Sequence, residues 1–196
     1  FIYILLTSLT FLVVGCQNES EEIRLINQAE RLFDAYPDSV ITTLDSIPLP
    51  EEMSPRLIAR WCMLYARAAD KIEDEMPYTN QLEIALKYYQ KKKMREEEAE
   101  IGLYLGRSYV EDKEYEKAMR TYSDALKVAL AIKDYNRAGY ICSYMGDLYE
   151  VDLRYILAAE KYKESGKYFH LANNTTSYVR AFVNEGRSYM LSLIHI

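Results

Sequence analysis

Four charged residues recur at one position of a forty-residue pattern. Three of them carry a guanidinium group suited to binding a carboxylate, and the fourth is itself a carboxylate. Arg67, Arg107, Asp147 and Arg187 each follow a Gly or an Ala, at intervals of forty residues. A guanidinium group donates paired hydrogen bonds whose geometry matches a carboxylate. The three arginines are therefore candidates for binding acidic peptide groups or a chain-terminal carboxylate.

A second position of the same repeat, seven residues before the first, adds three candidates. We call these two repeated positions the first and the second register. It holds Arg60, Tyr140 and Arg180, and a spacing of two helical turns places both registers on one helix face. A second interpretation, which we favour, is that the arginines form ion pairs with acids of the same surface. The acids concerned are Asp70, Glu111 and Asp147.

The sequence offers little support for catalysis. His170 lies near the end of a predicted helix, where a packing or surface role is the ordinary one. The sequence has no phosphate-binding Gly-rich loop, no paired-His metal motif and no Gly-flanked nucleophilic Ser. We therefore expect a protein that is not an enzyme and that holds no metal and no cofactor.

The elements that position the candidates are copies of one pattern. The central copy is the five-residue run 105–109, with Gly106 and Tyr109, and the residues that follow it at helical spacing. The full set of repeated packing positions is Gly106, Tyr109, Ala118, Tyr122 and Ala125, then Gly146, Tyr149, Ala158 and Tyr162, and finally Gly186 and Tyr189. A weaker upstream copy has Ala66, Leu82 and Ala85. A fixed period of this size indicates stacked structural repeats.

Apolar residues three and four apart predict that each repeat is a pair of helices. Turns are expected at 93–94, 133–134 and 173–174, forty residues apart. The predicted hairpins cover about 23–48, 54–93, 95–133 and 135–173, with a partial one at 175–190. The register glycines are expected to let the first helix of a hairpin approach the second beside the small Ala118 and Ala158.

This arrangement of Gly, Tyr and Ala resembles the tetratricopeptide repeat family over about residues 55–190. The resemblance implies an all-α solenoid of antiparallel helical hairpins that binds proteins or peptides through its first-helix groove, without enzymatic activity. Two features depart from the family. Its usual Trp is replaced by Gly102, Cys142 and Phe182, and the period is forty rather than 34 residues.

The N-terminal end predicts export and lipidation. Residues 1–15 are almost wholly apolar, too short for a spanning helix of roughly 20 residues, and are typical of a signal peptide whose basic leader is missing. The run ends in Gly15-Cys16, which resembles the lipobox of bacterial lipoproteins. Residues 16–22 would be the lipidated Cys16 and a polar tether. These features predict a lipid anchor in a Gram-negative-type cell envelope, periplasmic, at the outer membrane or on the cell surface.

The C-terminal six residues, 191–196, resemble the translation of a sequencing-library adapter. Under this interpretation His195 has no functional weight, and the native chain continues differently beyond Met190. The copy around Gly186 also lacks a following helix to cover it, and a solenoid needs such cover at its ends. We therefore expect a protein longer than this sequence.

Composition limits the class of ligand. The 196-residue chain has a net charge of −6 and a pI near 5.1, which argues against nucleic-acid binding by this segment. Besides Cys16 there are two cysteines, Cys62 and Cys142, two periods apart. Stacked repeats would hold these positions on the order of 20 Å apart, too far for a disulfide, so both are expected to be buried free thiols.

Three functions remain open from the sequence. The first is a membrane-anchored scaffold that binds a protein or peptide, with acidic groups as the expected point of recognition. The second is the extracytoplasmic half of a membrane-bound sensor whose DNA-binding or kinase domain is missing from the fragment. The third is a binding lipoprotein for glycan uptake, which the single Trp makes less attractive because sugar platforms favour stacked aromatic rings.

Overall fold

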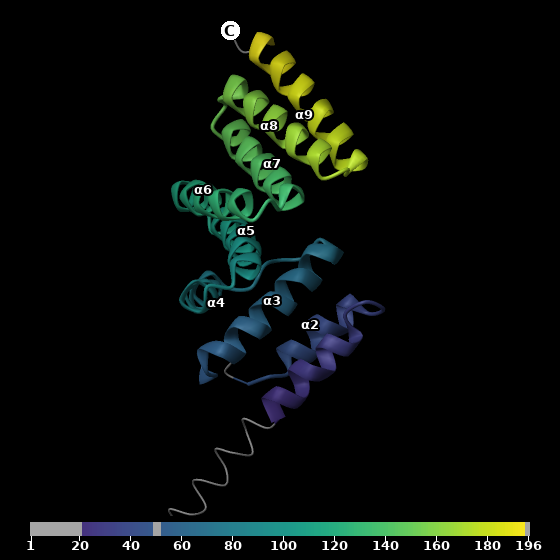
Figure 1. Ribbon diagram of the computed structural model, residues 1–196, viewed down its shortest axis with the longest axis vertical. Coiled ribbons are helices and arrows are strands. Elements are labelled where there is room, and N and C mark those ends of the chain that lie inside the picture. Colours follow the sequence, from purple (N-terminus) through teal and green to yellow (C-terminus); the bar gives the residue numbers. More distant parts are fainter. Residues whose placement is uncertain (1–20, 49–51, 195–196) are drawn as a thin grey trace, which may run out of the picture. The chain divides into compact units, whose positions relative to one another are not determined.

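The computed structural model describes residues 21–48 and 52–194, and within these ranges its regular structure is helical, without strands (Figure 1). Consecutive helices pack against each other as hairpins. The chain is an all-α solenoid of helical hairpins, and this part of the sequence-based expectation is confirmed.

After a helix over residues 21–32, the helices follow one another with short connections. Their bounds are α2 Pro37–Asp45, α3 Pro55–Ile72, α4 Thr79–Lys92, α5 Arg95–Glu111, α6 Tyr115–Ala131, α7 Tyr135–Val151, α8 Tyr155–Leu171 and α9 Thr175–Ile194. The contacts divide the chain into two compact units, with the division between Tyr88 and Tyr89 inside α4. Unit 1 denotes the described residues up to Tyr88, and unit 2 those from Tyr89 on.

Unit 1 is held together where α2 packs on α3. Leu44 in α2 is fully buried, and its carbonyl oxygen accepts a hydrogen bond from the indole Nε1 of Trp61, at 3.2 Å. A buried Trp ring therefore fixes α3 to α2 both by its apolar area and by its one polar atom. Cys62 follows directly and is a buried free thiol.

Unit 2 contains α5 to α9, each packed on the next, and α5 also packs on α7. Figure 1 shows α7, α8 and α9 side by side. The first helices of successive hairpins are therefore close enough to touch, which is expected on the inner side of a curved stack. We call the surface formed by α5, α7 and α9 the inner wall.

The turns explain the length of the repeat. A residue with positive φ ends each of six helices, at intervals of twenty residues. These residues are Glu73, Lys93, Lys113, Lys133, Leu153 and Asn173. In unit 2 each 17-residue helix from α5 to α8 is followed by a three-residue connection, so two helices and two connections make forty residues. Glu114 N–H donates to the Tyr109 carbonyl at 2.8 Å, and Lys113 N–H donates to that of Val110 at 3.0 Å, which is the paired bond pattern of a Schellman C-cap.

The register glycines make room for a tyrosine ring, so the predicted contact beside Ala118 and Ala158 was wrong. A Cβ added to Gly106 would lie on the ring of Tyr122, and a Cβ added to Gly146 would lie 2.8 Å from Cε1 of Tyr162. Both rings are fully buried. The large side chain needs the space at this crossing because the ring of the second helix is inserted against the backbone of the first. Ala118 and Ala158 are fully buried elsewhere in the two hairpins.

The third register glycine has different surroundings. A Cβ at Gly186 would meet nothing within 4 Å, because no described element packs on this side of α9. The neighbouring Phe182, Val183 and Met190 are 65%, 60% and 61% exposed, and Tyr189 is 41% exposed. Helix α9 runs on through Leu191 to Ile194, into the stretch predicted to be adapter-derived, and that prediction stays open.

Candidate functional site

The inner wall is joined by pairs of side chains that lie 37 residues apart. Glu100 of α5 accepts a hydrogen bond from Arg137 of α7 at 3.1 Å, and Tyr140 of α7 lies 3.2 Å from Ser177 of α9 through their hydroxyl groups. The offset is one forty-residue repeat minus about one helical turn, because neighbouring parallel helices are shifted along their axes. Each first helix therefore meets the next through polar contacts.

An ion pair between residues 37 apart also joins α7 to α9. Arg187 donates to Glu150 at 2.8 Å, and the Ser188 hydroxyl donates to the other oxygen of that carboxylate at 2.5 Å. Glu150 is 19% exposed and Arg187 49% exposed. Hydrogen bonding and the charge of Glu150 raise the pKa of Arg187, against an opposing effect of desolvation. The sequence interpretation paired the arginines with Asp147 among others; for Arg187 the hydrogen-bonded partner is Glu150, one helical turn away.

Asp147 is bound from the second helix of its own hairpin. The Tyr162 hydroxyl donates to its Oδ1 at 2.5 Å. Desolvation raises the pKa of the Asp147 carboxyl, with the charge of Glu150 adding to the rise, and the Tyr162 bond and Arg187 oppose it. The residue nevertheless has solvent-exposed surface. A carboxylate that has many protein neighbours and is still reached by water is well placed to meet a ligand.

Arg107 has aromatic neighbours at the equivalent position of the preceding hairpin. Its guanidinium lies over the ring of Tyr144, 5.7 Å from the centroid, and Tyr144 stacks at 5.9 Å on Tyr122. The hydroxyl of Tyr122 is buried and has no hydrogen-bond partner. Burial raises the pKa of Tyr122, and the nearby charge of Asp147 adds to the rise while Arg107 opposes it. The charges of Arg107 and Asp147 therefore act on one buried group, which places them in one neighbourhood.

The second register is only partly available. Tyr140 packs edge-on against Phe169, with ring centroids 4.9 Å apart, and is 37% exposed. Arg180 is exposed on α9 and forms no ion pair within the described part of the chain.

Two predicted residues lie in unit 1. Arg60 donates to Asn27 at 2.9 Å and to Glu30 at 2.8 Å, so its guanidinium ties α3 to the helix of residues 21–32. Arg67 is an exposed residue of α3. The structure thus brings Arg107, Asp147 and Arg187 into one surface and does not establish a common surface with Arg60 and Arg67.

Sequence reasoning missed the partners that complete this surface. Tyr144, Glu150 and Ser177 were not candidates, although the complementary pairs 100/137, 107/144, 140/177 and 150/187 all share one spacing. A search for complementary side chains at the repeat length minus one helical turn would have found them. The forty-residue period alone pointed to equivalent positions on successive first helices and not to these pairs.

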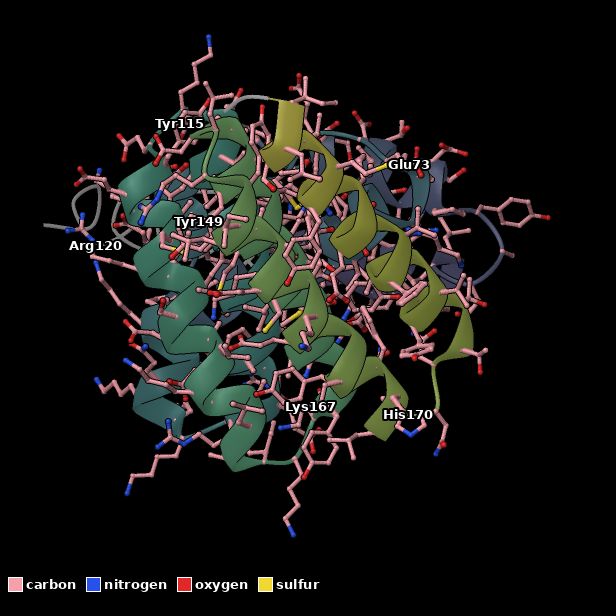
Figure 2. The ribbon with its side chains drawn as sticks, turned by 90° about the horizontal axis from the view of Figure 1, so that it is seen from above. Glu73, Tyr115, Arg120, Tyr149, Lys167 and His170 are labelled. Atoms are coloured by element: carbon pink, nitrogen blue, oxygen red, sulfur yellow. The ribbon has the colours of Figure 1, made fainter. Side chains whose placement is uncertain are left out.

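The remaining sequence candidates for chemistry have ordinary surroundings. His170 is exposed near the end of α8, as Figure 2 shows, with its ring 5.8 Å from that of Tyr178. Within the described ranges no cluster of His, Cys, Asp and Glu has the arrangement needed to hold a metal ion. No described helix combines the length and apolar character that a membrane crossing requires.

The three cysteines differ. Cys62 and Cys142 are buried free thiols, as expected. Burial raises the pKa of both thiols, that of Cys142 to about 12 with a contribution from Glu164, so neither is a reactive thiolate at neutral pH. Cys16 lies outside the described residues, and its predicted lipidation stays a prediction.

Comparison with known proteins adds no relative. The chain matches no protein-family model and has no significant sequence match among curated proteins. Its functional interpretation therefore depends on the geometry of its own residues.

Proposed function

We propose that the chain is a non-catalytic scaffold of tetratricopeptide-like hairpins that binds an extended protein segment along the inner wall of unit 2. The observation that supports this most directly is the uninterrupted series from Arg107 through Tyr144 and Asp147 to Arg187. These side chains combine charge, aromatic surface and solvent exposure. An extended peptide suits such a row because its backbone and side chains can meet successive helices.

The same row favours partners with carboxylate groups. Arg107 is half-buried over an aromatic ring, where a guanidinium is less hydrated and its hydrogen bonds to a carboxylate gain strength. Arg180, exposed and without an ion-pair partner in the described residues, supplies a second cation on α9. Asp147 lies between Arg107 and Arg180 in the sequence, and its negative charge would disfavour an acidic group of the peptide beside it. The expected ligand therefore carries separated acidic residues.

The test is binding of the full chain to an array of extended peptides that vary in the number and spacing of acidic residues. Arg107→Ala and Arg180→Ala should each weaken binding of the best acidic peptide by about tenfold, the effect of losing roughly 1.4 kcal/mol. The matched control is Arg120→Ala, since Figure 2 shows Arg120 pointing outward from α6. Equal binding by wall and control variants would remove the proposal, provided that circular dichroism shows all variants folded.

We further propose that Cys16 carries lipid and holds the scaffold in the cell envelope. The proposal is supported by the Gly15-Cys16 sequence after an apolar run and by the burial of the other two thiols. In cells that process lipoproteins, a fatty-acid analogue should label the wild type and the Cys62→Ser variant, and should not label Cys16→Ser. Equal labelling of all three proteins would show that Cys16 is not the acceptor.

A further inference from the structure

A cavity of about 400 Å³ lies within unit 1 and shares no lining residue with the proposed wall. Aromatic side chains and acidic groups line it together. Its main lining residues are Trp61 and Tyr65 of α3, Asp45 of α2, Glu75 and Tyr78 of the connection to α4, and Gln81 of α4. A pocket with aromatic walls and carboxylates has the chemistry of a cation site.

Gln81 lines the cavity with a buried side chain. The residue is 5% exposed, and its side-chain Oε1 has no hydrogen-bond partner among the described residues. Because that oxygen has almost no accessible surface, it is closed to a ligand in the cavity. The acidic residues that line the cavity are Asp45 and Glu75.

The aromatic residues form the apolar part of the cavity. The rings of Trp61 and Tyr65 lie 5.0 Å apart at an angle of 38°, and Tyr78 is 79% exposed at the opening. Trp61 is held in place by its bond to Leu44. A planar cation can therefore enter from solvent beside a ring whose position is already set.

The electrostatic environment of the cavity favours positive charge. The pKa of Tyr65 is raised to about 12, first by desolvation and then by Asp45, Asp74, Tyr78 and Glu75. The pKa of Asp45 is raised by desolvation and by the charge of Asp74. Desolvation is the larger cause of both shifts, and the nearby carboxylates add to it by repelling a further negative charge. A bound cation would relieve that repulsion.

We propose that this cavity binds the guanidinium group of an arginine side chain from a partner polypeptide. Two acidic residues line the site from different elements, Asp45 of α2 and Glu75 of the connection to α4. A guanidinium carries five N–H donors in one plane and stacks on aromatic rings. A quaternary ammonium group has no N–H to donate to the carboxylates, and an uncharged side chain lacks the charge that they attract. The arginine site extends the proposed scaffold role without depending on the inner wall of unit 2.

The test uses Trp61, the only Trp of the chain, as the reporter. The indole N–H signal of the full-length protein is followed by NMR during titration with Nα-acetyl-arginine methylamide, with the citrulline analogue as its uncharged isostere and tetramethylammonium as a cation without N–H groups. The arginine probe should shift the signal in a saturable way. The other two probes should bind at least tenfold more weakly.

Two variants identify the groups responsible. Asp45→Asn should weaken the arginine probe about tenfold, whereas Asp34→Asn, the removal of an exposed acid elsewhere in unit 1, should leave it unchanged.

Four results would overturn the arginine site: no saturable shift with the arginine probe, equal affinity for citrulline, equal affinity for tetramethylammonium, or unchanged arginine binding by folded Asp45→Asn. The peptide-array test of Arg107 and Arg180 concerns unit 2, so failure of either test is distinguishable from failure of the other.

Discussion

The hairpin of α5 and α6 and the hairpin of α7 and α8 have the same framework and differ at one polar position. Both place a buried Tyr ring over a register Gly. In the second hairpin the ring hydroxyl of Tyr162 donates to Asp147, whereas in the first the equivalent position is Arg107 and the hydroxyl of Tyr122 has no partner. A guanidinium has no acceptor atom for a hydroxyl proton.

This difference separates the residues that specify the fold from a residue that varies. The Gly and Tyr of each hairpin are complementary in shape and recur. The residue after the Gly lies on the inner wall and varies in charge. In unit 1 the same two registers hold Ala66 and Leu82, both fully buried. The residue at the Gly register is therefore larger than in unit 2, and the residue at the Tyr register is smaller.

The largest expected effect on stability follows from replacing the register Gly that the two hairpins share. Gly106→Ala should lower the free energy of unfolding by about 2 to 3 kcal/mol and Gly146→Ala by about 1 to 2 kcal/mol, because the new methyl group must displace a fully buried ring. Gly186→Ala should instead raise it by up to about 1 kcal/mol, the helix-propensity gain alone. Urea titrations followed by far-UV circular dichroism measure all three, since the single Trp reports on unit 1.

A double variant tests the explanation for this loss. Gly106→Ala with Tyr122→Leu copies the pair found at Ala66 and Leu82. It should be more stable than the sum of the two single changes by at least about 1 kcal/mol. Additive single effects would show that the methyl group does not act through the Tyr122 ring.

The second effect concerns the two hydroxyl groups and should differ between the hairpins. Tyr162→Phe removes a hydrogen bond to a carboxylate and should lower the free energy of unfolding by about 1 to 2 kcal/mol. Tyr122→Phe removes a buried hydroxyl that has no partner and should be neutral or stabilising by up to about 1 kcal/mol. Urea titrations of the two variants beside the wild type provide the comparison, and equal losses would mean that the Tyr122 hydroxyl is satisfied.

The fold was predictable because its signals are local and repeated. Helical spacing and the forty-residue period placed the helices and the turn at 93–94, and α4 ends and α5 begins there. The left-handed backbone at Lys113 and Leu153 has no signal in the sequence, because neither residue is a Gly or an Asn, the residues that usually mark such a position.

The site was less predictable because its partners depend on how helices shift past one another. Equivalent residues such as Arg107 and Asp147 are found from the period, but the contacts that define their surroundings come from residues 37 apart. The cavity beside Trp61 depends on three separate elements meeting. No spacing within a single helix encodes that meeting, and an unpartnered Gln81 oxygen is visible only in three dimensions.

A smaller effect on stability is expected from the negative charge of Asp147, the residue that distinguishes the second hairpin from the first. Because the pKa of Asp147 is raised above its ordinary value of 3.8, the folded state holds the proton more tightly than the unfolded state. Its contribution to stability is present below the ordinary pKa and is lost as the pH rises through the raised pKa. Asp147→Asn, which keeps an acceptor for Tyr162, should therefore unfold at nearly the wild-type temperature in acid and slightly above it at neutral pH.

The matched control for this charge is Asp124→Asn, an exposed acid of α6 that pairs only with Lys127 at the surface. Thermal unfolding curves from pH 3 to pH 7 give the difference between each variant and the wild type. A difference for Asp147→Asn that does not grow with pH would show that its carboxylate is not destabilised in the folded state.

The smallest effect tests whether the two hairpins share their turn as closely as their helices. Lys113 and Leu153 hold φ values of 61° and 57°, which a side chain with a Cβ disfavours and Gly adopts freely. Lys113→Gly and Leu153→Gly should each raise the free energy of unfolding by about 0.5 kcal/mol, the lower end of the usual range. Asn173→Gly should change less, because Asn tolerates this conformation. Leu153 is 67% exposed, so removing its side chain should expose little new apolar surface; a loss on Leu153→Gly alone would mean that the second turn is stabilised by packing that the first turn lacks.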